Sequence, residues 1–123
     1  MLPTREVVLV DDDPGFVETL GALLRFEGYS VVTELTFSAA LQYLSRHKAD
    51  VLITDVSLGA KTGNGWQLAK YATRHQPGLR VIVVTALADH LDADIEYWRL
   101  PVFLKPFDPD QLLEHLRSDQ GHE

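Results

Sequence analysis

Five short apolar segments recur along the chain, and longer segments of mixed polarity separate them. The apolar segments are residues 7–10, 31–35, 51–54, 81–85 and 102–104. Three of them are almost continuous Val, Ile and Leu, which is typical of strands covered on both faces in a parallel sheet. Residues 31–35 are interrupted by Thr33 and Glu34, so we expect this strand at an edge of the sheet.

Helical patterns fill the intervals between these strands. Apolar residues three or four positions apart predict helices from Pro14 to near Gly28, over residues 37–47, 66–75 and 88–98, and from Pro109 onwards. Asp13 and Asp108 each precede a proline, which supplies an N-cap and a first-turn proline. Strands that alternate with helices predict an α/β fold, a (βα)₅ doubly wound five-stranded parallel sheet. We expect one domain over residues 1–123, with its core at about 6–117 and a loose tail at 118–123.

The composition is that of an ordinary globular domain and excludes several classes of protein. The chain has 123 residues, 46% hydrophobic content, a net charge of −7 and no cysteine. No apolar run approaches the roughly 18 residues of a membrane span, and the first residues lack a signal-peptide pattern. The negative charge argues against a nucleic-acid surface. The lack of cysteine excludes disulfides and agrees with a cytoplasmic location. A start at Met1 and a polar end favour a stand-alone domain over a fragment.

Polar side chains follow the predicted strands at the points where these strands end. The first strand is followed by Asp11, Asp12 and Asp13, and later strands by Asp55, Thr85 and Lys105. In an open α/β sheet, ligands bind beyond the carboxyl ends of the strands, so these groups should meet at one edge. Carboxylates suit Mg²⁺, and a lysine with a hydroxyl suits the oxygens of a transferred phosphoryl group. The sequence therefore predicts a site for magnesium and phosphate.

Four motifs, V-D-D-D-P, I-T-D, V-V-T-A and L-K-P-F-D, occur in this order at the strand ends. With them the chain resembles the CheY-like receiver domain of bacterial two-component response regulators, from about Val7 to Leu116. The resemblance implies a flavodoxin-like fold with the strand order 2-1-3-4-5. It also implies a signalling domain rather than an enzyme, whose own chemistry is limited to self-catalysed phosphotransfer and autodephosphorylation.

The resemblance carries specific roles onto residues of this chain. Asp55 would accept the phosphoryl group. Mg²⁺, or Mn²⁺, would be held by oxygen atoms of Asp11, Asp12, Asp55 and the backbone carbonyl of Ser57. Asp12 would bind the metal directly and Asp11 mainly through water. Thr85 and Lys105 would bind phosphoryl oxygens, with a cis Lys105–Pro106 peptide aiming the lysine.

The same resemblance implies partners. A sensor histidine kinase or a phosphotransfer protein would donate the phosphoryl group, and a downstream protein target would read it. The face formed by the fourth helix, the fifth strand and the last helix would be available for homodimer formation. No nucleic acid and no membrane are expected to bind this domain.

Three features depart from the usual receiver pattern. The loop after Asp55 has Gly59 in place of a proline and about two extra residues, if Gly65 matches the family glycine. The position of the usual switch aromatic is Val102, and Phe103 is expected to point to the opposite side of the strand. We therefore expect phosphorylation to be read through this loop and the fourth helix. Tyr97 and Trp98 either anchor a partner or cover the end of the core.

Two alternatives belong to other functional classes. In a haloacid-dehalogenase-like phosphatase, Asp11 would be the nucleophile and Asp13 the acid–base. Pro14 and Phe16 do not match the residues that usually follow that motif, and Asp13 is better explained as a helix cap. A degenerate receiver would bind partners without phosphorylation, but all four types of site residue are present here.

Overall fold

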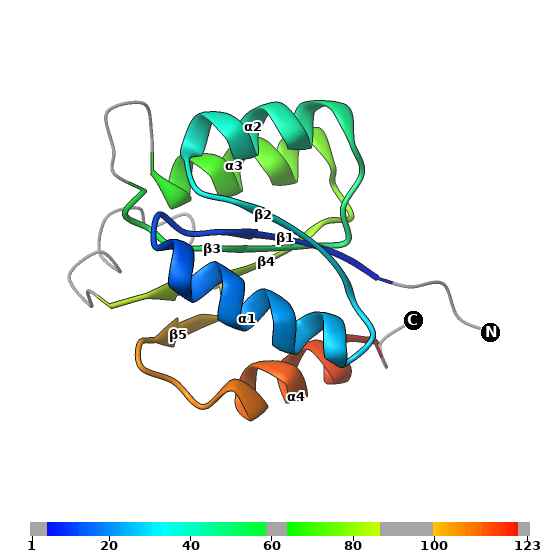
Figure 1. Ribbon diagram of the computed structural model, residues 1–123. Helices are drawn as coiled ribbons and strands as arrows, with labels where there is room; N and C mark the ends of the chain where they lie inside the picture. Colours follow the sequence, from blue (N-terminus) through cyan, green and yellow to red (C-terminus); the bar gives the residue numbers. More distant parts are fainter. Residues whose placement is uncertain (1–4, 59–63, 87–99, 121–123) are drawn as a thin grey trace.

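One parallel sheet of five strands lies between two layers of helices (Figure 1). The computed structural model describes residues 5–58, 64–86 and 100–120. The strands are β1 (Glu6–Val10), β2 (Ser30–Glu34), β3 (Val51–Thr54), β4 (Arg80–Thr85) and β5 (Val102–Leu104). The helices are α1 (Pro14–Phe26), α2 (Phe37–Arg46), α3 (Gly65–His75) and α4 (Pro109–Gln120). The strand order β2-β1-β3-β4-β5 confirms the predicted topology, with β2 at an edge.

The observed boundaries differ slightly from the predicted ones. β2 spans Ser30–Glu34 rather than residues 31–35, because the chain leaves the sheet at Leu35, whose side chain is 41% exposed. The next residue, Thr36, already caps α2 by accepting the N–H of Ala39 on its hydroxyl. The predicted helix over residues 88–98, with Tyr97 and Trp98, lies outside the described residues.

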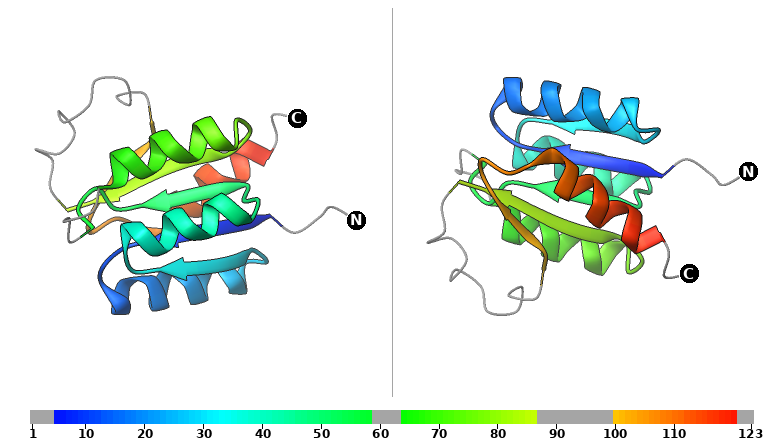
Figure 2. Two further views of the ribbon diagram at one scale, coloured as in Figure 1. Left: turned by 90° about the horizontal axis from the view of Figure 1, so that it is seen from above. Right: turned by 90° about the horizontal axis from the view of Figure 1, so that it is seen from below.

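Side chains of the strands alternate between the two faces of the sheet. On β1, Val7 and Leu9 pack with residues of α1 and α4, whereas Val8 and Val10 pack with residues of α2 and α3. The views from above and below show these two helix pairs on opposite sides of the sheet (Figure 2). Val102 and Phe103 also join different clusters, which confirms that they point to opposite sides of β5.

The helix ends follow from local side-chain chemistry. Asp13 accepts the N–H groups of Gly15 and Phe16 on one carboxylate oxygen, at 3.0 and 3.3 Å, and thereby caps α1. After α1, Gly28 has a φ of 102°, a conformation that glycine adopts without a steric penalty. None of the described helices is long and apolar enough to cross a membrane.

Gln76 connects the C-terminal ends of α2 and α3. These helix ends lie near the amino ends of the strands, opposite the edge where the strands finish. Its amide nitrogen donates to the carbonyl oxygens of Leu44 and His47, at 3.0 and 2.8 Å. Its amide oxygen accepts the N–H of Ala49 at 2.9 Å. One side chain therefore satisfies three backbone groups that the end of α2 leaves without helical partners.

We expect Gln76→Ala to lower the free energy of unfolding by about 1–2 kcal/mol, because these backbone groups lose their partners. Urea denaturation followed by circular dichroism would measure the change. Gln111→Ala, at an exposed position of α4, is the matched control and should change stability by less than about 0.5 kcal/mol. Equal stabilities of the two variants would contradict the assigned role of Gln76.

Candidate functional site

Three carboxylates meet at the carboxyl edge of the sheet. The register pairs Val10 of β1 with Thr54 of β3, so the next residues, Asp11 and Asp55, leave neighbouring strands at the same level. The N–H of Asp55 donates to the carbonyl oxygen of Val10 at 3.0 Å and continues this pairing. Asp11, Asp12 and Asp55 each offer a carboxylate oxygen, and these three atoms lie within 4.8 Å of one another.

The three carboxylates differ in their exposure and hydrogen bonds. Asp11 is fully buried and Asp55 is 8% exposed, whereas Asp12 is exposed to solvent. One oxygen of Asp11 accepts the N–H of Asp13 at 3.0 Å, and one oxygen of Asp55 accepts the N–H of Val56 at 2.7 Å. The second oxygen of each buried carboxylate is turned to the same cation, Lys105.

Lys105 brings a positive charge to the site. It directly follows β5, the edge strand at the opposite end of the sheet from β2. Its Nζ lies 2.5 Å from Oδ2 of Asp11 and 3.4 Å from Oδ2 of Asp55. Its backbone N–H donates to the carbonyl oxygen of Thr85 at 2.9 Å, which extends the pairing of β4 with β5. The Lys105–Pro106 peptide is cis, as the resemblance implied.

Burial and charge set the pKa values at the site. Burial raises the pKa of Asp11 above 3.8, although the hydrogen bonds from Lys105 and from the Asp13 N–H act in the opposite direction. Burial alone would lower the pKa of Lys105, but the hydrogen bond and charge of Asp11, together with Asp55, outweigh it and raise that pKa above 10.5. The lysine therefore stays an ammonium ion at neutral pH.

The acidic cluster fits a small divalent cation. Mg²⁺ prefers oxygen ligands at about 2.1 Å, so oxygens at opposite corners of its octahedron lie about 4.2 Å apart. Three carboxylate oxygens within 4.8 Å are close to this spacing, and exposed Asp12 leaves room for water ligands. Ser57, whose carbonyl was predicted as a further ligand, is half-buried two residues after Asp55.

Thr85 is buried at the end of β4, next to β3 in the sheet. It lies two positions beyond Val83, which pairs with Thr54, the residue before Asp55. The predicted site residues thus lie at one edge of the sheet. Asp11, Asp55 and Lys105 are in direct contact, Asp12 lies beside them, and Thr85 ends the adjacent strand. Val102 and Phe103 belong to β5, three and two positions before Lys105, respectively.

Two further residues border the site. Sequence reasoning noted Gly65 only as a possible family match. A Cβ atom at this position would lie 2.0 Å from the carbonyl oxygen of Asp55, so the start of α3 packs directly on the backbone of Asp55. Sequence reasoning did not assign Phe16 to the site at all, because an apolar residue at helical spacing is expected in the core.

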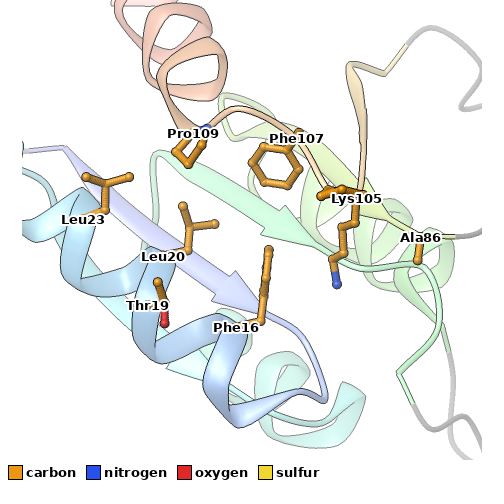
Figure 3. Close-up of a pocket in the computed structure, with 9 residues that line it drawn as sticks. Phe16, Thr19, Leu20, Leu23, Ala86, Lys105, Phe107 and Pro109 are labelled. Carbon is orange, nitrogen blue, oxygen red and sulfur yellow. The ribbon is translucent and has the colours of Figure 1, made fainter.

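Phe16 and the site residue Lys105 both line a groove next to the site. The ring centroid of Phe16 is 4.1 Å from Nζ of Lys105. The close-up in Figure 3 shows the lysine side chain extending toward this ring. The groove has a volume of about 490 Å³ and runs between α1 and the segment that leads from β5 into α4. Its lining is mostly apolar and includes Leu20, Leu23, Phe107 and Pro109. Lys105 is therefore bounded by carboxylates on one side and by an aromatic ring on another.

We expect Gly65→Ala to destabilise the protein and displace Asp55, because the added methyl group would overlap the Asp55 carbonyl oxygen. The free energy of unfolding should fall by about 2 kcal/mol or more, and the backbone amide resonances of Asp55 and Val56 should shift. Gly78→Ala is the matched control, because a Cβ atom there meets no heavy atom within 4 Å. Gly65→Ala with unchanged stability and unchanged resonances would contradict this packing.

Comparisons with known proteins agree with the geometry. The family model of the response regulator receiver domain matches residues 7–117. The chain is 39% identical over 111 residues to the transcriptional regulatory protein GlrR of Escherichia coli (strain K12), covering 88% of this chain and 24% of that protein. It is 29% identical over 115 residues to the response regulator ArlR of Staphylococcus aureus (strain Mu50), covering 92% of this chain and 51% of that protein. The chain thus spans at most about half the length of these curated relatives.

Solved structures share the fold over almost their whole length. A CheY-like receiver domain protein from Methanospirillum hungatei JF-1 has a TM-score of 0.86 at 24% identity, covering 95% of this chain and 94% of that chain. The response regulator TrrA of Thermotoga maritima, in complex with Mg²⁺ and BeF, has a TM-score of 0.82 at 25% identity, covering 94% of this chain and 98% of that chain. The family match over residues 7–117 shows that this chain belongs to the response regulator receiver domains of two-component signalling.

Proposed function

We propose that this receiver domain accepts a phosphoryl group on Asp55 from the phosphohistidine of a sensor histidine kinase or a phosphotransfer protein. The observation that carries the proposal is the position of Asp55, whose Oδ2 faces Lys105 inside a cluster with two further carboxylates. Lys105, with a divalent cation held by the carboxylates, would neutralise and position the three equatorial oxygens of a phosphoryl group, which is most of what phosphoryl transfer requires.

The hydrogen bonds of Asp55 suggest which atom reacts. Its Oδ1 accepts the Val56 N–H at 2.7 Å, whereas its Oδ2 accepts only the longer hydrogen bond from Lys105 at 3.4 Å, so Oδ2 is the more available nucleophile. In the transfer, an Oδ2 electron pair forms the new O–P bond, the P–N bond to the donor histidine breaks, and the imidazole nitrogen keeps that electron pair. Lys105 then pairs with the phosphoryl oxygens, and the Thr85 hydroxyl donates a hydrogen bond to one of them.

Magnesium, or manganese, belongs to the same proposal. Asp11, Asp12, Asp55 and the carbonyl of Ser57 would hold the ion, with Asp12 the closer of the first two carboxylates. The ion, when bound, would offset negative charge on the phosphoryl oxygens. The support for this part is the close approach of the three carboxylate oxygens and the chemistry of the donor set.

The proposal also covers the effect of phosphorylation on downstream partners. Phosphorylation would change the affinity for a downstream protein, read through the loop after Asp55 and the segment between β4 and β5, because Val102 replaces the usual aromatic. GlrR is a transcriptional regulatory protein and ArlR is a response regulator. The downstream target of this chain is not assigned, and homodimer formation and a cytoplasmic location remain predictions.

Asp55→Asn should abolish Mg²⁺-dependent labelling by acetyl phosphate, because the amide is not a nucleophile toward phosphorus. Labelling would be measured by the mass of the intact protein or by electrophoresis that retards aspartyl phosphate. Asp13→Asn is the matched control and should be labelled normally, because asparagine also caps a helix and keeps the backbone N–H, and the Asp13 side chain accepts the N–H groups at the start of α1. Labelling that survives Asp55→Asn but is lost in Asp11→Asn would contradict the proposal and support the phosphatase alternative.

Lys105→Met should raise the affinity for Mg²⁺ by about tenfold or more, since the two buried carboxylates lose the cation that competes with the metal. Labelling by acetyl phosphate should become much slower in the same variant, because the phosphoryl oxygens lose their ammonium partner. Calorimetric titration would measure the metal affinity, and Lys48→Met, at an exposed position before β3, is the control. Unchanged or weaker Mg²⁺ binding in Lys105→Met would contradict the assigned ion pairs.

A further inference from the structure

The ammonium group of Lys105 has an aromatic neighbour that phosphoryl chemistry alone does not require. Its Nζ lies 4.1 Å from the ring centroid of Phe16, within the range of a cation–π interaction. The same atom lies 2.5 Å from Oδ2 of Asp11 and 3.4 Å from Oδ2 of Asp55. Figure 3 shows the lysine reaching from its strand toward the first turn of α1, where Phe16 stands. The cation therefore contacts two carboxylates and one ring.

Phe16 is held in place both through its backbone and through its ring. Its backbone N–H donates to the Asp13 carboxylate, and the Asp13 N–H donates to Asp11, so the acidic run itself sets the position of Phe16. Its ring makes an edge-to-face contact with Phe107 at 6.2 Å between centroids. Phe107 also contacts Phe103, at 5.7 Å. Phe103 and Phe107 lie two positions before and two positions after Lys105.

An aromatic face differs from the other two neighbours of Lys105 in one useful way. It attracts the cation through its quadrupole, but it offers no oxygen lone pair for a strong hydrogen bond. A carboxylate at this place would hold the N–H groups and compete with a phosphoryl oxygen. A leucine would cover the lysine without attracting its charge. The ring can therefore hold the ammonium near Asp55 while its N–H donors remain free to change partners.

We propose that Phe16 is a positioning residue for Lys105, one that holds the ammonium at the proposed acceptor site, at the end of the groove that both residues line. The inference rests on the proposed phosphorylation of Asp55. In this view Lys105 exchanges a hydrogen bond to Asp11 for one to the phosphoryl group, and its contact with Phe16 persists through the exchange. The ring contributes through charge attraction and position and makes no bond to the phosphoryl group.

The kinetic test is a series of substitutions at position 16, with labelling of Asp55 by acetyl phosphate at saturating Mg²⁺ as the measurement. Phe16→Leu should slow labelling by about threefold to thirtyfold, the rate equivalent of a cation–π contact. Phe16→Tyr should restore the rate. Singly and multiply fluorinated phenylalanines, which keep the ring shape but weaken its quadrupole, should slow labelling step by step. Phe37→Leu, the same change in the other core cluster, is the control and should leave the rate unchanged.

A second measurement does not depend on phosphorylation. Nζ of Lys105 lies over the ring of Phe16, so the NMR resonances of the adjacent Hε protons should be shifted upfield, and Phe16→Leu should remove that shift. If Asp55 is never labelled but this signature is present and lost as expected, the proposed function fails while the contact stands. Equal rates across the fluorinated series, or normally placed Lys105 resonances in the unmodified protein, would overturn the role of Phe16.

Discussion

The repulsion among the carboxylates at the end of the sheet is the constraint on which the site depends. Charges on Asp11 and Asp55 at a separation of up to 4.8 Å repel by on the order of 3 kcal/mol, and both side chains are buried. Lys105 offsets this repulsion by contacting both of them. Removing one partner from such a buried ionic group is costly, because the remaining charges lose their compensation. The lysine therefore stabilises the ionised pair and also takes part in the proposed chemistry.

The charge balance at this edge also explains why a metal and a phosphoryl group suit it. One ammonium cannot neutralise three carboxylates, so the edge keeps an excess of negative charge that favours a divalent cation. With the cation present, the edge becomes attractive to phosphoryl oxygens. Because Lys105 is shared between Asp11 and Asp55, it can move toward a new anion without leaving the site. Electrostatic balance thus connects the stability of the edge with its proposed function.

Asp55, the proposed acceptor, is also connected to the rest of the domain through its backbone. Asp55 is paired with β1 through its N–H, and α3 begins against its carbonyl oxygen at Gly65. The Gly65 N–H donates to the carbonyl oxygen of Val56 at 2.8 Å, and Asn64 with Gln67 forms a capping box that fixes the same turn. A change at the Asp55 side chain is thereby positioned to reach α3 directly. The aromatic cluster of Phe16, Phe107 and Phe103 links Lys105 to the other helix layer.

The sequence by itself determined the carboxyl ends of four strands, the order of the described helices and strands, and the acidic and basic residues that meet at the edge of the sheet. Those features depend on short-range patterns, such as continuous apolar runs, Asp-Pro helix starts and a polar residue directly after each strand. The strand predicted at residues 31–35 lies one position earlier, at Ser30–Glu34, because the mixed polarity of an edge strand does not define where it begins and ends. Only the tertiary structure decided the contacts of Lys105, the close packing at Gly65 and the place of Phe16 against the ammonium. These depend on distances between residues far apart along the chain, 94 positions for Lys105 and Asp11, and no local pattern encodes such distances.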